Sequence, residues 1–392
     1  MRILLANEAR SGGGGVETYL ASLPSALEAR GHEVAMLYAN SGSEDGPTRI
    51  STRESWSVAD LGIDAAMAGV RAWRPDVCFS HNMRVLDVDE RLAAGWPTYK
   101  MMHGYFGTCV SGHKAFAFPR VEPCARRCGP GCLACYLPRR CGQLRFGAMT
   151  AQYAWAMRQQ RLFSRYAGLV VASDHMRREY LRYELGESRV HTIPLFASCG
   201  GRVPPGQPSI DVLFLGRMTA LKGAAVLIRA ATHAASILGR PLTVVLAGEG
   251  PDRSHVERLA HEPARRDYLA VTCPGWVDPE ARATLLSRTA VVAVPSIWPE
   301  PFGLVGLEAA EHGVPAVAFD VGGIRQWLTD DVNGRLAGIG GGAPAFGDAL
   351  ASVLGDPAVR ARLSAGAREA ARRFSADAHV TTLERLLERR GA

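Results

Sequence analysis

Two glutamates in the second half of the chain lie at a spacing that could bind one polar ligand. In the segment PSIWPEPFGLVGLEAAEHGVPAVAF, Glu300 falls on a predicted loop and Glu308 inside a helix that we expect to begin near Gly303. The amides of residues 302–304 would then be unpaired at the amino end of that helix, with Glu308 about one and a half turns further on. Unpaired amides bind phosphate, and carboxylates accept hydrogen bonds from sugar hydroxyls. The pattern therefore predicts a site for a ligand that carries both groups, such as a nucleotide sugar.

Two basic residues, Arg217 and Lys222, follow a predicted strand in the segment FLGRMTALKG. They lie at a strand end and a helix start, so both side chains could reach one anion. Fixed cations at the amino end of a helix suit a diphosphate, whose charge must be held and then stabilised as it grows on a leaving group. Two solvated surface charges are the alternative interpretation.

A run of four glycines, Gly12 to Gly15, separates the first predicted strand from the first predicted helix. Its amides, those of Gly14 and Gly15 included, could cradle a phosphate, and a flexible turn is the alternative. The run does not match the dinucleotide fingerprint G-x-G-x-x-G, because Glu17 stands in place of the third glycine. The second strand ends at Asn40 without an acidic ribose-binding residue. These departures argue against a nicotinamide-dependent enzyme, and we expect no organic cofactor.

Six of the nine cysteines fall within 33 residues, and four of them form the pattern C-x3-C-x3-C-x2-C over residues 124–135. Clustered thiols in a protein without a disulfide framework indicate metal ligation, and these spacings suit tetrahedral zinc. We expect a structural metal, zinc before an iron-sulfur cluster, held by any four of the six thiols. Unligated thiols or disulfides are the alternative. The six residues are Cys109, Cys124, Cys128, Cys132, Cys135 and Cys141.

The positive charge of the chain is concentrated in one segment. The whole sequence has a formal net charge of +7, whereas residues 100–165 carry 11 basic and 1 acidic side chains, a net of +10. No RNA-binding aromatic signature, helix-turn-helix or basic zipper accompanies this segment, which argues against nucleic acid as a partner. An anionic substrate or an anionic membrane surface fits better, and a solvated surface is the alternative.

Alternating strands and helices predict two Rossmann-like doubly wound α/β domains with parallel sheets. The first extends over residues 1–198 and contains the cysteine-rich insert at about 109–141. A linker rich in Gly, Pro, Gln and Ser covers residues 198–209, and the second domain covers 210–375. We expect residues 376–392 to form a helix that packs back on the first domain. Two such domains in tandem would leave a cleft that receives the ligands.

Composition limits the class of protein. Hydrophobic residues make up 47% of the chain and charged residues 21%, which excludes disorder, collagen and coiled coil as overall descriptions. No apolar run approaches the length of a signal-peptide core or of a membrane span. We therefore expect a cytoplasmic protein, peripheral on the inner face of the membrane if its basic segment binds lipid.

Several segments resemble the retaining glycosyltransferases of family 4, which have the GT-B fold. They are GGGGVETYLASLPSALEARGHEV, FLGRMTALKG, LAGEGPD, PGWVDPEARATLL and EPFGLVGLEAAEHGVPAVAFDVGG, in the order and spacing of that family. The resemblance covers nearly the whole chain, and the E-x7-E segment is its most specific part. It implies transfer of a hexose from a UDP or GDP sugar to an acceptor hydroxyl, with the donor on the second domain and the acceptor on the first.

The resemblance also assigns roles to residues. Arg217 and Lys222 are expected to hold the donor diphosphate. Glu308 is expected to bind the ribose and Glu300 the hexose hydroxyls. His103, in KMMHGYFG, matches the active-site histidine of many relatives, although a structural role is the commoner fate of a single histidine. We expect His103 and Glu300 to act at the transferred sugar, and the donor to be bound by Gly14, Gly15, Arg217, Lys222, Gly250, Trp276, Val277, Phe302, Gly303, Leu304 and Glu308.

The implied acceptor is a saccharide or a lipid-linked molecule in polysaccharide or glycolipid biosynthesis. Two other functions remain open at this point. A sugar-nucleotide epimerase of the same fold would act on the donor alone, and a carbohydrate-binding scaffold would not turn it over. Neither the base, the hexose nor the acceptor follows from these residues.

Overall fold

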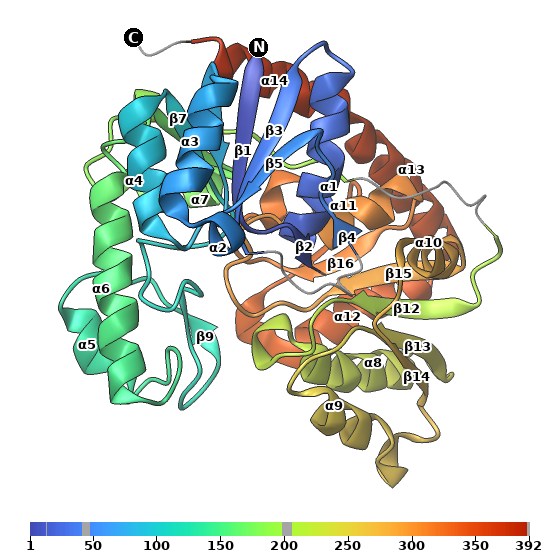
Figure 1. The fold of residues 1–392 in the computed structure, drawn as a ribbon. Coiled ribbons are helices and arrows are strands. Elements are labelled where there is room, and N and C mark those ends of the chain that lie inside the picture. The colour runs from blue at the N-terminus through green and yellow to red at the C-terminus, as the bar shows by residue number, and fades with distance from the viewer. Residues whose placement is uncertain (13, 41–47, 198–205, 390–392) are drawn as a thin grey trace. The chain divides into compact units, whose positions relative to one another are not determined.

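The computed structural model describes residues 1–12, 14–40, 48–197 and 206–389 (Figure 1). The chain divides into two compact units. Unit 1 contains Met1–Lys114, Ala125–Ser198 and Ala376–Ala392, and unit 2 contains Ala115–Cys124 and Cys199–Ser375. Residues 115–124, which the sequence placed in the first domain, thus group with unit 2. Positions 198–205 of the expected linker lie outside the described residues.

Unit 1 is built on a parallel sheet of seven strands in the order β11-β10-β7-β6-β1-β3-β5. The central strands β1, β6 and β7 are almost entirely buried, so their sequences are near-continuous apolar runs. The strands are β1 (Arg2–Ala9), β3 (Glu33–Asn40), β5 (Glu54–Ser57), β6 (Val77–Ser80), β7 (Thr98–Met102), β10 (Gly168–Val171) and β11 (Val190–Thr192). Two further strands, β2 (Ser11–Gly12) and β4 (Thr48–Arg49), form a separate short antiparallel sheet.

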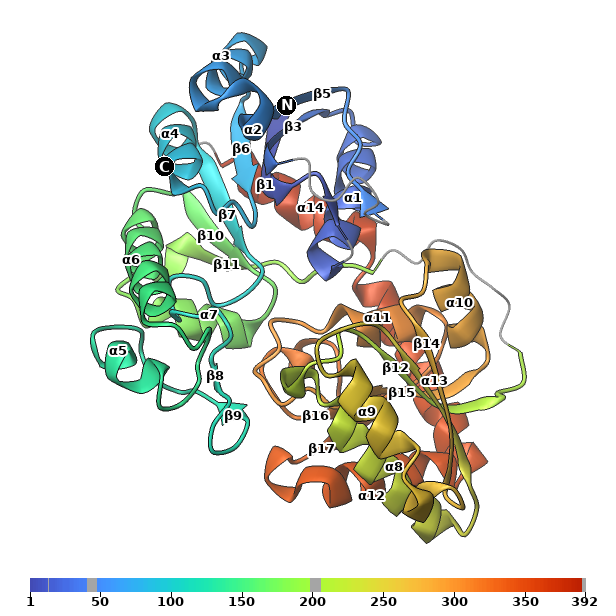
Figure 2. The same cartoon turned by 60° about the horizontal axis from the view of Figure 1, so that its bottom comes forward.

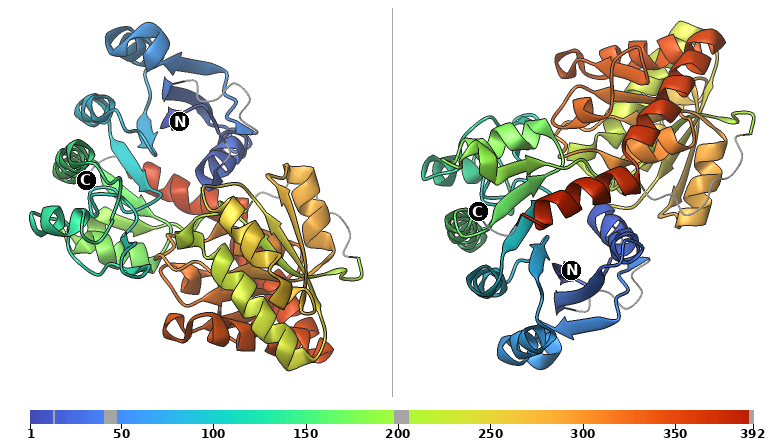
Figure 3. Two further views of the ribbon diagram at one scale, coloured as in Figure 1. Left: turned by 90° about the horizontal axis from the view of Figure 1, so that it is seen from below. Right: turned by 90° about the horizontal axis from the view of Figure 1, so that it is seen from above.

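Helices cover both faces of this sheet, with α3, α4 and α6 along one and α1 and α14 along the other (Figure 2). The last helix, α14, contacts α1 and therefore belongs to unit 1 (Figure 3). The helices are α1 (Gly15–Glu28), α2 (Val58–Leu61), α3 (Ile63–Trp73), α4 (Leu86–Gly95), α5 (Gly131–Tyr136), α6 (Phe146–Leu162), α7 (Asp174–Leu181), the 3-10 turn η1 (Glu187–Arg189) and α14 (Ala376–Leu387).

Unit 2 has a parallel sheet of six strands in the order β14-β13-β12-β15-β16-β17. Numbered from β12, this order is 3-2-1-4-5-6, that of the dinucleotide-binding fold. The strands are β12 (Ile210–Leu215), β13 (Leu242–Ala247), β14 (Leu269–Gly275), β15 (Thr289–Val294), β16 (Ala316–Phe319) and β17 (Gly334–Ala337). A separate antiparallel pair joins β8 (Ala115–Phe116) and β9 (Glu122–Pro123).

The helices of unit 2 also lie on both faces of their sheet (Figure 1). Asp278 and Asp356 cap α10 and α13 with their carboxylates, each followed by a proline at the first helical position, which is favoured there. The helices are η2 (Ala220–Lys222), α8 (Ala224–Leu238), α9 (Arg253–Ala260), η3 (Pro263–Arg265), α10 (Pro279–Ser287), α11 (Leu304–Glu311), η4 (Ile324–Gln326), η5 (Ile339–Gly341), α12 (Gly342–Leu354) and α13 (Pro357–Arg373).

One described segment, Ala220–Leu238, is long and apolar enough to cross a membrane by length and composition alone. It contains α8, which packs against α12 and buries Leu227, Ile228 and five alanines. Those contacts are the ones a core helix of an α/β unit makes. The segment is therefore part of the core of unit 2.

The cysteine-rich insert is held in unit 1 by tyrosine hydroxyls. The Tyr180 hydroxyl donates to the carbonyl of Gly104 over 2.7 Å, and that of Tyr183 donates to the carbonyl of Thr108 over 3.0 Å. Tyr136, fully buried on α5, donates to the Gln152 side chain on α6 over 2.7 Å. Aromatic burial with satisfied hydroxyls thus supplies packing that the sequence interpretation assigned to a metal.

Each sheet reverses its strand order at one place, between β1 and β6 in unit 1 and between β12 and β15 in unit 2. In open parallel sheets, ligands bind beyond the carboxyl ends of the strands at such a point. Ligand-binding residues are therefore expected directly after β1, β6 and β7 in unit 1, and directly after β12 and β15 in unit 2.

Candidate functional site

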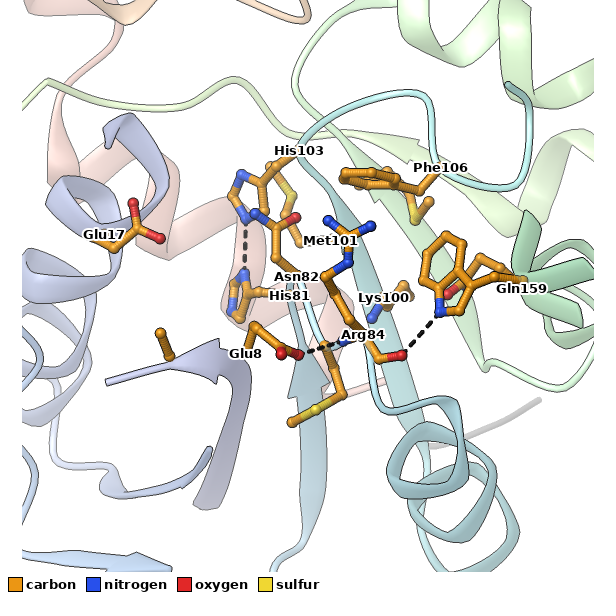
Figure 4. A pocket seen from close by; sticks show the side chains of 14 residues that line it. Glu8, Glu17, His81, Asn82, Arg84, Lys100, Met101, His103, Phe106 and Gln159 are labelled. Atoms are coloured by element: carbon orange, nitrogen blue, oxygen red, sulfur yellow. Dashed lines mark hydrogen bonds between the residues drawn. The ribbon is translucent and has the colours of Figure 1, made fainter. Parts of the chain in front are cut away.

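A cavity of about 220 Å³ lies at the carboxyl ends of β1, β6 and β7 in unit 1 (Figure 4). Glu8 contributes from β1, His81 and Arg84 from the loop after β6, and His103 from the loop after β7. Trp155 of α6 lines it as well. The expected active-site histidine therefore opens into a real pocket, at the reversal of strand order.

His103 is hydrogen-bonded to a second histidine. Its Nε2 lies 3.0 Å from Nδ1 of His81, whose side chain is completely buried (Figure 4). Burial, and then the nearby Lys100 ammonium, lower the pKa of His103 to about 3. Burial, followed by the charges of His103 and Lys100, also holds the pKa of His81 well below its usual value. Both rings are therefore neutral at physiological pH.

Arg84 is the exposed cation of this pocket. Its guanidinium lies 5.5 Å from the ring centroids of both Phe106 and Trp155. Its backbone is held at both ends, since the amide donates to Glu8 over 2.8 Å and the carbonyl accepts from the Trp155 indole over 2.9 Å. Among the described residues no carboxylate pairs with the Arg84 guanidinium. The pocket thus presents one positioned cation.

A buried ion pair lies beneath the pocket. The Lys100 ammonium donates to Asp89 over 2.6 Å and to Ser80 over 3.0 Å, and both charged side chains are almost fully buried. Tyr166 also donates to Asp89, over 2.9 Å. Burial lowers the pKa of Lys100, and Asp89 opposes that shift. These hydrogen bonds offset the cost of removing the Lys100 ammonium from water in the largely apolar β7.

The glycine run and the C-terminal helix flank the same pocket. Gly14 caps α1, and its amide donates to the Glu17 carboxylate over 3.1 Å, so that amide already has a partner. Gly13 lies outside the described residues. From α14, His379 donates through Nδ1 to the carbonyl of Pro194 and accepts at Nε2 from the Tyr19 hydroxyl, over 2.7 and 2.9 Å. The Tyr19 ring packs 5.8 Å from that of His103.

In unit 2, two residues for which separate roles were expected are in direct contact. The Lys222 ammonium donates to Glu300 over 2.6 Å, and the Ser296 hydroxyl donates to the same oxygen over 2.5 Å. Glu300 is nearly completely buried, whereas Lys222 keeps about a third of its side chain exposed. The ammonium also lies 5.3 Å from the Trp298 ring. Lys222 thus balances a buried carboxylate and still faces solvent.

Glu308 is paired with a residue that sequence reasoning missed. One nitrogen of the Arg282 guanidinium, on α10, lies 3.2 and 3.3 Å from the two carboxylate oxygens. Burial raises the pKa of Glu308, while Arg282 opposes that shift. Arg282 lies in the segment PGWVDPEARATLL, but no role was expected for it, because an arginine on an amphipathic helix ordinarily faces water.

The loops around these pairs depend on two glycines. Gly303, which caps α11 at a φ of 87°, has the Ile324 side chain 2.8 Å from where a Cβ would lie. Gly250 has the carbonyl oxygen of Met218 2.3 Å from its own Cβ position. Neither site accommodates a side chain, so the chain approaches closely there. α11 begins at Leu304, one residue beyond the start expected from the sequence.

The remaining predicted donor residues differ in exposure. The Phe302 side chain is buried, and its carbonyl accepts from the Trp327 indole over 2.6 Å. Trp276 follows β14 with 45% of its surface exposed, next to the half-buried Val277. Arg217 follows β12, is exposed, and forms no ion pair within the described part of the chain. An exposed indole and an unpaired cation are suited to a base and a phosphate, respectively.

The cysteines do not form the expected metal site. Within the described residues, no three side chains of the ligating types come together in a way that could hold a metal ion. Cys132 points its sulfur at the carbonyl of Arg127, 3.9 Å away, and Cys141 points its sulfur at the carbonyl of Cys135, 3.8 Å away. A four-thiolate centre requires sulfurs converging on one point. The arrangement of Cys109, Cys124, Cys128, Cys132, Cys135 and Cys141 therefore does not fit the zinc or iron-sulfur centre expected from their spacing.

The structure thus brings four of the expected residues into contacts that the sequence did not indicate. Lys222 and Glu300 meet each other and Ser296, and Glu308 meets Arg282. In unit 1, His103 meets His81. The signal that could have found His81 is its position, since it directly follows a buried strand next to the reversal of strand order.

Two family models match the chain and together cover most of it. The model of glycosyltransferase family 4 matches residues 13–198, and the model of glycosyl transferases group 1 matches residues 204–370. A D-inositol 3-phosphate glycosyltransferase of Xylanimonas cellulosilytica is 42% identical over 171 residues. That match covers 42% of this chain and 39% of the relative, so the chain spans about two fifths of the length of that curated relative.

Solved structures match over nearly the full length. A sucrose-phosphate synthase from Thermosynechococcus elongatus has a TM-score of 0.70 at 20% identity, covering 99% of this chain and 98% of its own. The Anabaena protein HepE in complex with UDP has a TM-score of 0.68 at 19% identity, covering 99% and 100%. Likeness at such identities establishes the fold, and the expected two Rossmann-like sheets are confirmed. The chain is a glycosyltransferase of family 4 with the GT-B fold.

Proposed function

We propose that this glycosyltransferase transfers a hexose from a nucleoside-diphosphate sugar to an acceptor hydroxyl with retention of anomeric configuration. The observation that carries the proposal is the edge of unit 2 beyond β12 and β15. There a partly exposed lysine on a buried glutamate, an unpaired arginine and the start of α11 follow the switch point of the sheet. A neighbouring structure that binds UDP supports the choice of donor.

The donor residues act by charge and by hydrogen bonding. Arg217 and Lys222 would hold the diphosphate, assisted by the amides at the start of α11, and Glu308 would accept hydrogen bonds from the ribose hydroxyls. Arg282 opposes the rise in pKa that burial causes at Glu308 and so favours the carboxylate form, which accepts hydrogen bonds. Glu300 would bind hexose hydroxyls through the carboxylate oxygen that Lys222 leaves available. Trp276 and Val277 would pack against the base.

In the transfer step, the bond from the anomeric carbon to the diphosphate oxygen breaks and a bond to the acceptor oxygen forms on the same face. The acceptor proton passes to the departing diphosphate oxygen. Negative charge grows on that diphosphate, where the fixed cations and amides stabilise it. No nucleophile of the protein is required.

We assign the acceptor to the cavity of unit 1. Arg84 supports an acceptor with an anionic group, because it is a positioned cation without a carboxylate partner in the described chain. A saccharide phosphate and a lipid-diphosphate-linked sugar both have this chemistry. The relative that is named for an inositol phosphate agrees with an anionic acceptor.

Residues that directly follow the insert support a peripheral contact with an anionic membrane. Leu144 and Phe146 are 59% and 68% exposed and flank the exposed Arg145 at the start of α6. Exposed apolar side chains next to cations are suited to the boundary of an anionic bilayer. Such a contact would place the enzyme on the inner face of the cytoplasmic membrane, where glycolipid or polysaccharide precursors are assembled.

The function is tested by product analysis. The full chain is incubated with UDP and GDP sugars and a panel of saccharide phosphates and lipid-linked sugars, and released nucleoside diphosphate is measured. We expect acceptor-dependent release and, by NMR of the product, an anomeric configuration equal to that of the donor. A sugar-nucleotide epimerase would isomerise the donor without release, and a carbohydrate-binding scaffold would do neither. An inverted product would remove the retaining mechanism.

A further inference from the structure

The contact between His81 and His103 raises the question of which nitrogen carries each proton. Nδ1 of His81 and Nε2 of His103 are 3.0 Å apart, and two neutral rings share that contact (Figure 4). A neutral imidazole has one N–H donor and one acceptor nitrogen. One ring must therefore donate and the other accept, and this choice decides what the second nitrogen of His103 offers the pocket.

The second nitrogen of His103 is the one left for a ligand. Its Nε2 contacts His81, so Nδ1 is the nitrogen of His103 that can form a hydrogen bond with a ligand in the pocket. If His81 donates, Nδ1 of His103 carries a proton and is a hydrogen-bond donor. If His103 donates, Nδ1 carries a lone pair and is a base.

The surroundings of His81 favour the first arrangement. Nε2 of His81 is closed off by protein, and no described residue forms a hydrogen bond with it. Its ring contacts the apolar rings of Phe79 and Tyr19, at 4.4 and 6.0 Å between centroids. The Tyr19 hydroxyl already donates to His379. A buried N–H without an acceptor is rare and costly in proteins. If the proton of His81 lies on Nδ1, Nε2 of His103 can accept a hydrogen bond from it.

We propose that His81 is a positioning residue that donates from Nδ1 to His103, so that His103 presents an Nδ1–H donor to the reacting sugar and does not act as a base. The inference rests on the proposed function for the identity of that ligand, though not for the position of the proton. It goes beyond a role for His103 alone, since it makes a residue outside the sequence motif responsible for what His103 can do. It also agrees with a transfer step in which the acceptor proton goes to the diphosphate.

The proton is located directly by NMR on the full chain labelled with ¹⁵N in its histidines. Long-range ¹H–¹⁵N correlations distinguish protonated from unprotonated ring nitrogens, and loss of signals in His103→Gln and in His81→Gln assigns them. We expect the proton on Nδ1 in both His81 and His103 at pH 7. A proton on Nε2 of His103 would overturn the proposal, whatever the activity of the enzyme.

Three variants of His81 give a second readout. His81→Asn keeps an N–H donor near the position of Nδ1, His81→Asp offers only acceptor oxygens, and His81→Phe keeps the bulk without either. We expect turnover within about threefold of wild type for the Asn variant, and about a tenfold or greater loss for the Asp and Phe variants, as for the loss of one hydrogen bond to a developing charge. The donor KM should stay unchanged in all three.

The His81→Asp variant is the sharpest of these, because it should also move the proton of His103 to Nε2 in the NMR spectrum and raise the pKa of His103. His233→Asn, which replaces a partly exposed histidine of unit 2, serves as the matched control and should change neither the signals of His81 and His103 nor turnover. A fully active His81→Asp enzyme would contradict the proposal. If the wild type transfers no sugar at all, the proposed function fails, while the NMR arm still decides the position of the proton.

Discussion

The two units handle charge in opposite ways at the ends of their sheets. In unit 1 the two histidines of the candidate transfer site are neutral imidazoles beside the exposed cation Arg84, and the Lys100 ammonium, which also lines the pocket, is paired with the buried Asp89. In unit 2 each buried carboxylate is faced by a cation at the site itself, Glu300 by Lys222 and Glu308 by Arg282. A shared architecture therefore carries two kinds of chemistry.

The difference follows from what each ligand requires. A diphosphate brings charge that must be matched by fixed cations, and a ribose needs ionised acceptors. A sugar at the point of transfer is better served by donors that do not carry a proton away. Burial lowers the pKa of the unit 1 histidines, whereas in unit 2 the Arg282 guanidinium opposes the rise in pKa that burial causes at Glu308.

Removing one partner of the buried pair in unit 1 should have the largest effect. Asp89→Ala leaves the Lys100 ammonium buried without its carboxylate, which should destabilise the protein by about 3–5 kcal/mol. Urea unfolding of the full chain measures the change. The matched control is Glu249→Ala in unit 2, whose exposed pair with Arg253 should contribute under about 1 kcal/mol. Equal losses in the two variants would remove the contrast between the buried and the exposed pair.

Nucleotide affinity should depend on the charged pairs of unit 2. Glu308→Gln and Lys222→Gln remove a charge with little change in shape, and each should weaken UDP or GDP binding by about 1.5–3 kcal/mol. Glutamine is preferable to alanine at Glu308 because it leaves the Arg282 guanidinium an acceptor. Calorimetry gives the affinities, with Glu280→Gln on the exposed start of α10 as the control. Unchanged affinity in both variants would refute the assignment of the donor to these residues.

Acid should destabilise the chain through the histidines of unit 1. Burial lowers the pKa of His379 to about 4 and that of His103 to about 3, so the folded state stays neutral where the unfolded state takes up protons. Stability is therefore fully present above about pH 6.5 and is lost progressively as the pH falls toward those folded pKa values. Each such histidine should contribute a loss of about 2 kcal/mol between pH 7.5 and pH 5.

Unfolding at a series of pH values tests this. His379→Asn should be less stable than wild type at pH 7.5, because it loses contacts to Tyr19 and Pro194, and its stability should fall less on acidification. An acid loss of the same size in the variant would show that other groups cause it.

The smallest effect concerns the basic surface of the insert and of the residues that directly follow it. Arg145→Ser should weaken binding to vesicles rich in anionic lipid by about 1 kcal/mol, the contribution of one cation near such a surface. Arg266→Ser, an exposed arginine of unit 2, is the control and should leave binding unchanged. Binding should also fall with added salt. Indifference to lipid charge would leave only a solvated basic surface on Arg120, Arg126, Arg127, Arg139, Arg140 and Arg145.

Much of unit 2 was predictable because its site depends on backbone geometry. Gly303 and Gly250 are at positions where a Cβ has no room, and the acids and bases of its motifs fall at strand ends that local patterns identify. The pairing of Arg282 with Glu308 was not predictable. It joins two helices through residues that are 26 positions apart, and no local pattern indicates a role for Arg282.

Unit 1 was less predictable for the same physical reason. His81, Arg84 and Trp155 become neighbours only when β6 and α6 pack, and no local pattern records that contact. The metal expected from cysteine spacing shows the converse error. Spacing alone suited four thiolates, yet Tyr136, Tyr180 and Tyr183 hold the insert. Spacing along the chain limits a metal site but does not bring its ligands together.

The separation of nucleotide binding from transfer is the central claim, and one paired measurement tests it most directly. Nucleotide affinity and turnover at saturating donor are determined for His103→Ala and for Glu308→Gln in the full chain. We expect His103→Ala to bind UDP or GDP as the wild type does but to lose about 10²-fold or more in turnover, within the range for a group that acts in the transition state. Glu308→Gln should lose affinity and recover much of its turnover when donor is raised to saturation. A His103→Ala variant that turns over at the wild-type rate, or that loses as much nucleotide affinity as Glu308→Gln, would contradict the account.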